Sequence, residues 1–280
     1  MKFTKMHGLG NDFIVIGDRQ ELPAEAARLA VKLCDRNFGI GADGMVYLLP
    51  SDKADYQMRI INSDGSEAEQ CGNAIRCAAK YLYDRGMVSS EELMIETFGA
   101  GAQKVTVRVE NGKAAAVKVD MGKPILEGRK VPTTIDRTPV VNQPIEAGGE
   151  SYHFTAVSMG NPHCVIFVDD AVAFDLGKWG PQLETHPYFP NKVNVEFATV
   201  RDRNHIDMRV WERGAGPTLA CGTGACATLV ASVLNGKADR EAVVSLKGGD
   251  LQIEWNEADG HLYMTGPAEE VFEGRLAAEE

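Results

Sequence analysis

Short segments in which apolar residues alternate with polar ones, or follow one another without interruption, recur along the chain between Gly, Asp and Asn residues. This pattern is typical of β-strands and the turns between them. The clearest segments are residues 14–16, 56–61, 105–109, 117–119, 165–168, 193–197 and 208–211. The hydrophobic pattern therefore predicts a protein rich in β-structure.

Two segments have the composition of buried helices. Residues 72–85 carry small and apolar side chains at helical spacing, and residues 222–234 are apolar or small almost all round. A helix without a polar face is buried on every side. A buried helix in each of two strand-rich regions predicts the α+β class. We expect two pseudo-symmetric strand-rich lobes, each a curved or barrel-like sheet wrapped around its central helix.

Two further helices are expected outside these sheets. Pro23 opens the first, over residues 23–35, because proline is tolerated in a first helical turn. The second covers residues 175–185, although three helix-breaking residues interrupt it, namely Gly177, Gly180 and Pro181.

The strongest pattern in the sequence is a repeat at an offset of 150 residues. Cys71 followed by Gly72 recurs as Cys221 followed by Gly222. The same offset relates four other pairs of landmarks: Met58-Arg59 and Met208-Arg209, Gly10-Asn11 and Gly160-Asn161, Gly86 and Gly236, and Gly44 and Asn194. A fixed offset without gaps indicates two diverged copies of one unit. We expect a pseudo-two-fold axis to relate the copies.

The repeat and the chain length agree on two domains. A chain of 280 residues exceeds the usual size of a single core. Four prolines lie between the copies and fit a linker or the start of the second copy, namely Pro124, Pro132, Pro139 and Pro144. We predict an N-terminal lobe over residues 1–121 and a C-terminal lobe over residues 122–266. The tail over residues 267–280 is expected to return to the N-terminal lobe.

The overall charge excludes some classes of partner. The formal net charge is −11 and the isoelectric point is about 5.1, which argues against a nucleic acid and against an anionic membrane surface. The N-terminal residues lack the apolar core of a signal peptide. The longest apolar or small stretch, residues 224–234, is too short to span a bilayer. We therefore expect a cytoplasmic protein with neither a membrane nor a nucleic-acid partner.

The chain contains six cysteines, which stay reduced in the cytoplasm. No two of them have the CxxC spacing of a structural zinc site or a thioredoxin-like motif, so we expect no metal. Four are interpreted as small core residues: Cys34, Cys77, Cys164 and Cys226.

Cys71 and Cys221 differ from the other four because each directly precedes a predicted buried helix. The first amides of a helix lack internal partners and carry the positive end of its dipole. A thiol at this position is expected to ionise readily, and a carboxylate can bind the free N–H groups. Gly72 and Gly222 have no Cβ and allow such a carboxylate to approach the backbone.

These features suggest an acid/base pair. If both helix starts face one cleft, the two thiols lie on opposite sides of a bound carbon atom. One group removes a proton and the other returns a proton to the opposite face, which is the chemistry that inverts a stereocentre. The helix starts hold the carboxylate into which the carbanion charge spreads. No cofactor is needed for this reaction.

The sequence resembles the diaminopimelate epimerase family along essentially its whole length. The matching segments are MHGLGNDF (residues 6–13), GIGADG (39–44), NSDG (62–65), CGN (71–73), SMGNPH (158–163), ERG (212–214) and ACGTG (220–224). Each glycine-rich piece alone is weak, but as a set they are highly specific. The resemblance implies conversion between LL- and meso-diaminopimelate on the route to lysine and peptidoglycan, without a cofactor, by a homodimer.

The resemblance also implies roles for individual residues. Cys71 and Cys221 would be the thiolate/thiol pair. Glu212 would bind the reacting ammonium group, and Arg213 the distant carboxylate. The backbone amides that would hold the reacting carboxylate belong to Gly72, Asn73, Gly222 and Thr223. Neutral amide side chains would complete the lining: Asn11, Asn62, Asn161 and Asn194.

Three positions are less simple. Some members of the family carry Gln where this chain has Gly44, so no side-chain contact is expected there. His163 either hydrogen-bonds a catalytic thiol or Glu212, or is a hydrogen-bonded core histidine. His7 is expected to support the loop at Asn11.

Three alternatives remain from the sequence. A proline racemase also uses two cysteines, but it has no distal carboxylate to bind, which Arg213 and the four asparagines disfavour. A redox protein would pair Cys71 with Cys221 as a disulfide, although no closely spaced resolving cysteine accompanies them. A non-catalytic amino-acid-binding protein would keep its ligand after Cys71→Ser, whereas an enzyme would lose turnover.

Overall fold

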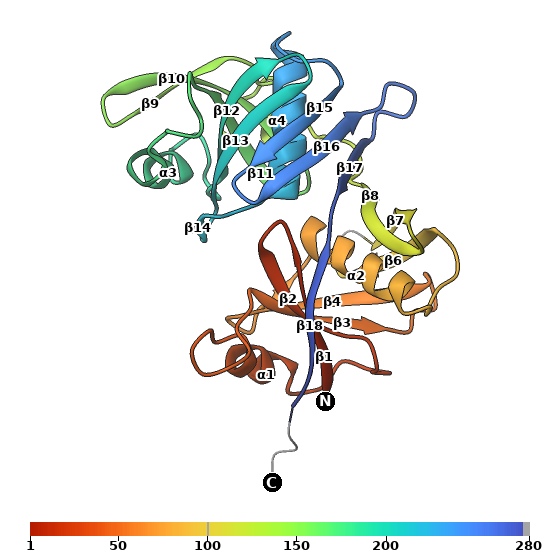
Figure 1. Ribbon diagram of the computed structural model, residues 1–280. Coiled ribbons are helices and arrows are strands. Elements are labelled where there is room, and N and C mark those ends of the chain that lie inside the picture. The colour runs from red at the N-terminus through yellow and green to blue at the C-terminus, as the bar shows by residue number, and fades with distance from the viewer. Residues whose placement is uncertain (100, 277–280) are drawn as a thin grey trace. The chain divides into compact units, whose positions relative to one another are not determined.

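The computed structural model describes residues 1–99 and 101–276, and the chain divides into two compact units (Figure 1). Unit 1 consists of Met1–Asp120 and the tail that begins at Thr265, and unit 2 consists of Met121–Met264. The four prolines at 124, 132, 139 and 144 therefore belong to the start of unit 2.

Unit 1 contains two helices and a mixed sheet. Its elements are β1 (Lys2–Gly8), β2 (Asn11–Ile16), α1 (Ala26–Leu33), β3 (Gly44–Leu49), β4 (Tyr56–Asn62), β5 (Glu67–Ala68), α2 (Gly72–Asp84), β6 (Glu92–Thr97), β7 (Gly101–Glu110), β8 (Lys113–Asp120) and β18 (Glu269–Arg275). β1 pairs antiparallel with both β18 and β2. Two parallel pairings, β2 with β3 and β4 with β6, join the antiparallel parts of the sheet.

After η1 (Gly128–Lys130) and β9 (Gln143–Ala147), unit 2 repeats the order of the elements β1 to β8 of unit 1. The repeated elements are β10 (Glu150–Ser158), β11 (Pro162–Phe167), α3 (Leu176–Glu184), β12 (Asn194–Asp202), β13 (His205–Glu212), β14 (Gly216–Pro217), α4 (Gly222–Leu234), β15 (Glu241–Leu246), β16 (Gly249–Trp255) and β17 (Leu262–Gly266). β10 pairs antiparallel with β9 and β11. The parallel pairings are β11 with β12 and β13 with β15. The two units thus share one connectivity, in which β9 takes the place that β18 has in unit 1.

Each sheet surrounds one central helix. α2 contacts β1, β2, β3, β4, β6, β7 and β8 of unit 1, and α4 contacts β10, β11, β12, β13, β15 and β16 of unit 2. α4 is buried on every side over most of its length, as its composition predicted. The α+β, strand-rich class with a helix inside each sheet is confirmed. Among the described strands neither sheet closes into a barrel, so each is a curved, open sheet.

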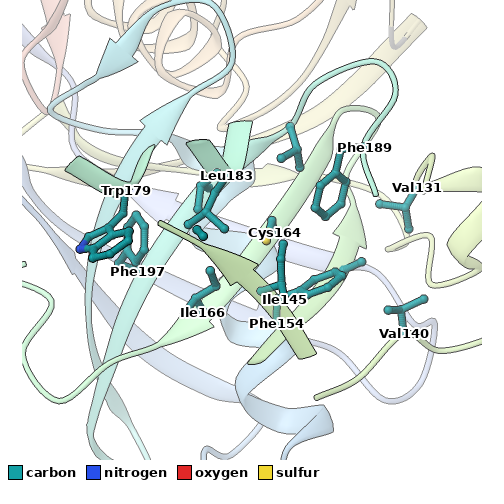
Figure 2. Close-up of a cluster of buried hydrophobic side chains, with 14 residues drawn as sticks. Val131, Val140, Ile145, Phe154, Cys164, Ile166, Trp179, Leu183, Phe189 and Phe197 are labelled. Carbon is teal, nitrogen blue, oxygen red and sulfur yellow. The ribbon is translucent and has the colours of Figure 1, made fainter. Parts of the chain in front are cut away.

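The outer helices cover the opposite face of each sheet. In unit 2, Trp179 and Leu183 of α3 belong to one apolar cluster with Phe154, Ile166 and Phe197 of the sheet (Figure 2). The glycine that was expected to interrupt α3 has a packing role, because a Cβ at residue 180 would overlap the Trp211 ring.

The predicted helix boundaries are close to those observed. The helix predicted over residues 222–234 has those bounds, and the one predicted over residues 72–85 ends at Asp84. The first outer helix is shorter than predicted, since α1 begins at Ala26 and ends at Leu33. All seven predicted strands fall on observed strands, except that Val168 and Val193 lie just outside β11 and β12.

Candidate functional site

The first candidate cluster lies in unit 1 at the start of α2. Cys71 is the N-cap residue of this helix, with an extended backbone (φ −151°, ψ 114°), and its side chain is half-buried. Its thiol donates a hydrogen bond to Asn11 Oδ1 at 3.6 Å, and Asn73 Nδ2 donates to the same oxygen at 3.1 Å. We refer to Asn11, Cys71 and Asn73 as cluster 1.

A group of charged side chains orients Asn11 by a hydrogen bond to its amide nitrogen. Asn11 Nδ2 donates to Asp43 Oδ2 at 2.7 Å, and Arg36 binds the other oxygen of Asp43 at 2.8 Å. Arg36 also binds Asp12, which forms a 2.7 Å ion pair with Lys5. Although burial alone would raise the pKa of Asp12, hydrogen bonds from Arg36 and Lys5 hold that pKa well below its usual range. We refer to Lys5, Asp12, Arg36 and Asp43 as the ionic group.

The turn that precedes Asn11 requires unusual backbone conformations. Leu9 and Gly10 both have positive φ angles, 56° and 87°. The Gly10 N–H donates to His7 Nδ1 at 3.4 Å, so His7 supports the Asn11 loop as expected.

Two other sequence-predicted positions of unit 1 have local partners. Asn62 ends β4, and its amide donates to Ser66 Oγ at 2.9 Å. Gly44 has no room for a side chain, because a Cβ there would lie 2.9 Å from the carbonyl oxygen of Ile61. In this chain the backbone of β4 therefore occupies the space that a side chain at residue 44, such as the Gln of some family members, would need.

The second candidate cluster lies in unit 2 at the start of α4. Cys221 is the N-cap residue there, with a backbone much like that of Cys71 (φ −128°, ψ 109°). Its sulfur lies 3.5 Å from Thr223 Oγ1, and Asn161 Nδ2 donates to that hydroxyl at 3.2 Å. We refer to Asn161, Cys221 and Thr223 as cluster 2.

The environment of Cys221 opposes ionisation of its thiol. Cys221 is only 6% exposed. Burial, and then the negative charges of Glu212 and Glu196, raise the pKa of Cys221 well above its usual value, against the opposing hydrogen bonds from Thr223 and the Gly224 N–H. The expectation that the helix start makes this thiol ionise readily is therefore wrong for Cys221. Desolvation outweighs the helix dipole at this position.

Glu212 accepts a hydrogen bond from the Thr218 hydroxyl and lies close enough to Cys221 to bond with its thiol. Burial raises the pKa of the Glu212 carboxyl above its usual value, despite the Thr218 hydrogen bond. A cation beside this carboxyl would relieve the penalty, as an ammonium group does.

His163 is fully buried and reaches neither a thiol nor Glu212 by a hydrogen bond. Its Nδ1 lies 2.7 Å from Glu196 Oε1, and its Nε2 lies 3.0 Å from Asn161 Oδ1. Both ring nitrogens are thus occupied, and the contact of His163 with cluster 2 runs through Asn161.

Asn194 and Arg213 form a local support. Asn194 Nδ2 donates to the Pro162 carbonyl at 2.8 Å, and Asn194 Oδ1 accepts from the Arg213 backbone N–H at 2.9 Å. The guanidinium of Arg213 donates to the Asn191 carbonyl at 3.5 Å. The Asn194 amide therefore links the Pro162 carbonyl to the backbone N–H of Arg213.

Sequence reasoning missed two residues that the structure places behind the asparagines. Asp43 orients Asn11, and Glu196 contacts the histidine that orients Asn161. Glu196 carried a detectable signal, because it is the one charged residue within the apolar segment 193–197. Asp43 carried none beyond its place in a glycine-rich stretch.

The remaining cysteines behave as core residues. All six cysteines are free of disulfides. Burial raises the pKa of Cys34 to about 11 and that of Cys77 to about 12, and Cys164 and Cys226 are completely buried. Residues 1–99 and 101–276 contain no group of three His, Cys, Asp or Glu side chains arranged to hold a metal ion. No helix in that part of the chain is long and apolar enough to cross a membrane.

Solved structures define the class of fold. A phenazine biosynthesis protein of the PhzF family from Bacillus anthracis is 18% identical, with a TM-score of 0.71 over 99% of both chains. A probable proline racemase from Agrobacterium radiobacter is also 18% identical, with a TM-score of 0.68 over 99% of this chain and 93% of that one. At this identity the likeness establishes the fold that these proteins share.

Sequence relatives define the family. The family profile described as diaminopimelate epimerase matches residues 3–127 and 155–271. Diaminopimelate epimerases from Pelotomaculum thermopropionicum and Acetivibrio thermocellus are 57% and 54% identical over 276 residues, at least 98% of each chain. The chain belongs to the diaminopimelate epimerase family.

Proposed function

We propose that this protein is a cofactor-independent epimerase that interconverts LL- and meso-diaminopimelate with Cys71 and Cys221 as its acid/base pair. The observation that carries the proposal is the duplication of one cluster. In each unit a cysteine is the N-cap residue of the central helix, and an asparagine at the β1–β2 turn or the β10–β11 turn belongs to the hydrogen bonds around it. Membership in the diaminopimelate epimerase family identifies the substrate. The product serves lysine and peptidoglycan-precursor biosynthesis.

The two clusters supply complementary steps. One cysteine, as a thiolate, removes the α-proton, and the other, as a thiol, gives a proton to the opposite face of the carbanion. Charge that develops on the substrate carboxylate is stabilised by the backbone N–H groups at the helix starts, those of Gly72 and Asn73 and those of Gly222 and Thr223.

Through Glu212, substrate binding changes the pKa of the Cys221 thiol. We assign Glu212 to the substrate ammonium group adjacent to the reacting carbon. Because the Glu212 charge raises the pKa of Cys221, an ammonium beside Glu212 lowers that pKa and makes the thiol available for proton transfer. Substrate binding thus offsets the part of the raised Cys221 pKa that is due to Glu212.

The distal end of the substrate is assigned to Arg213 and polar amides. A guanidinium matches a carboxylate in bidentate geometry. The Arg213 backbone is held by Asn194, so we assign Asn194 to positioning Arg213. Asn11, Asn62 and Asn161 remain assigned to the lining, with His163 as support for Asn161.

The test is isotope exchange in heavy water with purified, reduced protein and LL-diaminopimelate, without pyridoxal phosphate. We expect incorporation of α-deuterium together with meso product. Cys71→Ala and Cys221→Ala should each lower epimerisation by about 100- to 10,000-fold, while Cys77→Ala, a buried cysteine outside both clusters, should keep full activity. Absence of exchange with diaminopimelate, but turnover of proline or hydroxyproline, would assign the protein to the proline racemase alternative.

Assembly and location are proposed on the family resemblance and the composition. We propose a homodimer in the cytoplasm. Light scattering after size-exclusion chromatography should give twice the chain mass of 30.4 kDa, and a monomer active at the same concentration would contradict the dimer.

A further inference from the structure

Glu196 is a fully buried carboxyl group on β12 that the proposed reaction does not use. Its Oε1 lies 2.7 Å from His163 Nδ1 on the neighbouring strand β11. Its Oε2 is buried and has no hydrogen-bond partner among the described residues. A buried carboxylate is costly unless an opposite charge compensates it. The charge of the Glu196 carboxyl therefore depends on the charge of the His163 ring.

The carboxyl also lies against the start of α4. A Cβ on Gly224 would be 2.8 Å from Glu196 Oε1 and 3.3 Å from Cys221 Sγ. Because Gly224 has no side chain, the Glu196 carboxyl and the Cys221 sulfur can both lie against the first turn of α4. A negative charge at a helix start is stabilised by the dipole.

A continuous chain of hydrogen bonds leads from this carboxyl to the thiol. It passes from Glu196 to His163 at 2.7 Å and from His163 to Asn161 at 3.0 Å. It continues from Asn161 to Thr223 at 3.2 Å and from Thr223 to Cys221 at 3.5 Å. We refer to these five residues as the relay.

The geometry fixes the position of the hydrogens in the relay. Asn161 Nδ2 donates to Thr223, so Asn161 Oδ1 faces His163 Nε2. An amide oxygen only accepts, so Nε2 carries a hydrogen. On the other side of the ring, two lone pairs would repel at 2.7 Å, so a second hydrogen lies between Nδ1 and Glu196. If both hydrogens belong to the ring, His163 is an imidazolium paired with the Glu196 carboxylate.

The direction of the relay decides what reaches the sulfur. Because Thr223 Oγ1 accepts from Asn161, its own hydrogen is left to donate to Cys221. Without the hydrogen on Nε2 the Asn161 amide would rotate by half a turn, so that its nitrogen donates to His163. Thr223 would then donate to the Asn161 oxygen. In that arrangement Thr223 can only accept from the Cys221 thiol.

Unit 1 lacks the pair altogether. At the offset of 150 residues, Phe13 stands in place of His163 and Val46 in place of Glu196, and both are buried. The strands pair in the same register, since His163 lies opposite Asn194 as Phe13 lies opposite Gly44. The pair is therefore an addition specific to the surroundings of Cys221.

We propose that Glu196 is a positioning residue for Cys221: by holding His163 as an imidazolium it directs the hydrogen-bond donors of Asn161 and Thr223 toward the sulfur. The charged or titratable groups that face Glu196 are His163 and Cys164 from β11, Glu212 from β13 and Cys221 from α4. Among these only His163 supplies a positive charge.

The first test reads the ring nitrogens of His163 by NMR of the ¹⁵N-histidine-labelled protein without substrate. The chain has six histidines, and loss of a signal in His163→Phe assigns the one concerned. We expect both nitrogens of His163 to carry hydrogen, and one of them to lose it in Glu196→Gln. Glu184→Gln, which alters another buried carboxyl of unit 2, should leave these signals unchanged. A wild-type His163 with one bare nitrogen would overturn the proposal.

The second test is a double-mutant cycle on the epimerase reaction. Glu196→Gln should lower kcat about tenfold with KM changed less than twofold, because the substitution keeps the shape and removes a charge-assisted hydrogen bond. In the His163→Phe background the same substitution should change kcat less than twofold. Independent, multiplying effects of the two substitutions would contradict action through His163.

A variant without the buried charge guards against loss of folding. Glu196→Val combined with His163→Phe reproduces the Val46 and Phe13 packing of unit 1, and it should fold and show the kcat of His163→Phe alone. This kinetic arm rests on the proposed epimerase function, whereas the NMR arm does not. If the protein lacks epimerase activity but shows the imidazolium, the proposed function fails and the relay stands.

Discussion

The two units hold equivalent asparagines in opposite ways. In cluster 1, Asn11 donates to Asp43, which only accepts, so Asn11 Oδ1 always faces Cys71 and Asn73. In cluster 2, Asn161 faces His163, whose ring nitrogens can donate or accept. The orientation of the first asparagine is fixed, and the orientation of the second depends on a protonation state.

This difference shows how the two copies of a duplicated unit can take two roles while they keep the same connectivity. The cysteines share N-cap geometry and the same place in the connectivity. The positions behind them differ in charge: where unit 1 has Asp12 and Asp43 of the ionic group, unit 2 has Pro162 and Val193. Scaffolds of the same connectivity therefore place the two thiols in different electrostatic surroundings.

Removing the centre of the ionic group should have the largest effect on stability. Asp12→Asn leaves Lys5, which is 8% exposed, without its counter-charge. We expect a loss of about 3 kcal/mol in the free energy of unfolding at pH 7, measured by urea denaturation. Asp18→Asn, which alters an exposed carboxyl of the same unit, should change it by less than about 0.5 kcal/mol.

The same variant has a pH signature. The folded pKa of Asp12 is depressed, so its contribution is present above the unfolded value of about 3.9 and is lost as the pH falls through the folded value. The difference between wild type and Asp12→Asn should therefore shrink below about pH 4. A difference that stays constant down to pH 3 would show that Asp12 acts by packing alone.

Turning each asparagine into an aspartate should separate the two clusters. Asn11→Asp places a carboxylate oxygen 2.7 Å from Asp43 and should cost about 2 kcal/mol at pH 7. Like charges raise the folded pKa of the pair, so this variant should lose stability as the pH rises. Asn161→Asp faces His163 and should cost less than about 1 kcal/mol. Equal losses in urea denaturation would remove the contrast between the clusters.

The charge beside Cys221 gives a smaller effect. Glu212 is the second-largest cause, after burial, of the raised pKa of Cys221. Glu212→Gln should lower that pKa, because it removes the negative charge beside the thiol. The pH dependence of Cys221 alkylation, followed by mass spectrometry of its peptide, measures this shift, and Glu69→Gln in unit 1 is the control. An unchanged profile would assign the raised pKa to burial and Glu196.

The smallest effect concerns a cysteine outside both clusters. Cys77→Ala introduces the residue that unit 2 has at the equivalent position, Ala227. Loss of one buried sulfur atom should cost about 1 kcal/mol and leave kcat unchanged. A tenfold fall in kcat would show that Cys77 belongs to the chemistry.

The central helices were the part of the fold most readily predicted. α4 lacks a polar face, so the composition alone marks its bounds and its burial. The α1 boundaries were less certain, because the chain around Pro23 and Asp35 is polar and its helical turns depend on packing against the sheet. Strands such as β1 were missed because polar residues such as Lys5 occupy buried positions there.

The candidate site was predictable where a local signal existed. The N-cap placement of Cys71 and Cys221 follows from adjacent residues. The residues that orient Asn11 and Asn161 do not. Asp43 reaches Asn11, and Glu196 reaches the His163 that contacts Asn161, across parallel strand pairings that join residues far apart in the sequence. The raised pKa of Cys221 was missed because burial of the thiol in the fold, and then the charges of Glu212 and Glu196, outweigh the local helix dipole.

The last strand of unit 1 sets an order for synthesis on the ribosome. β18 pairs with β1 through Lys2–Arg275 and neighbouring residues, and Phe3 packs against Phe272. Unit 2, residues 121–264, is complete before β18 has been made. Until β18 emerges, β1 exposes an unpaired edge in the nascent chain, the kind of edge that recruits other chains. Unit 2 can thus finish folding during translation, whereas unit 1 closes only afterwards.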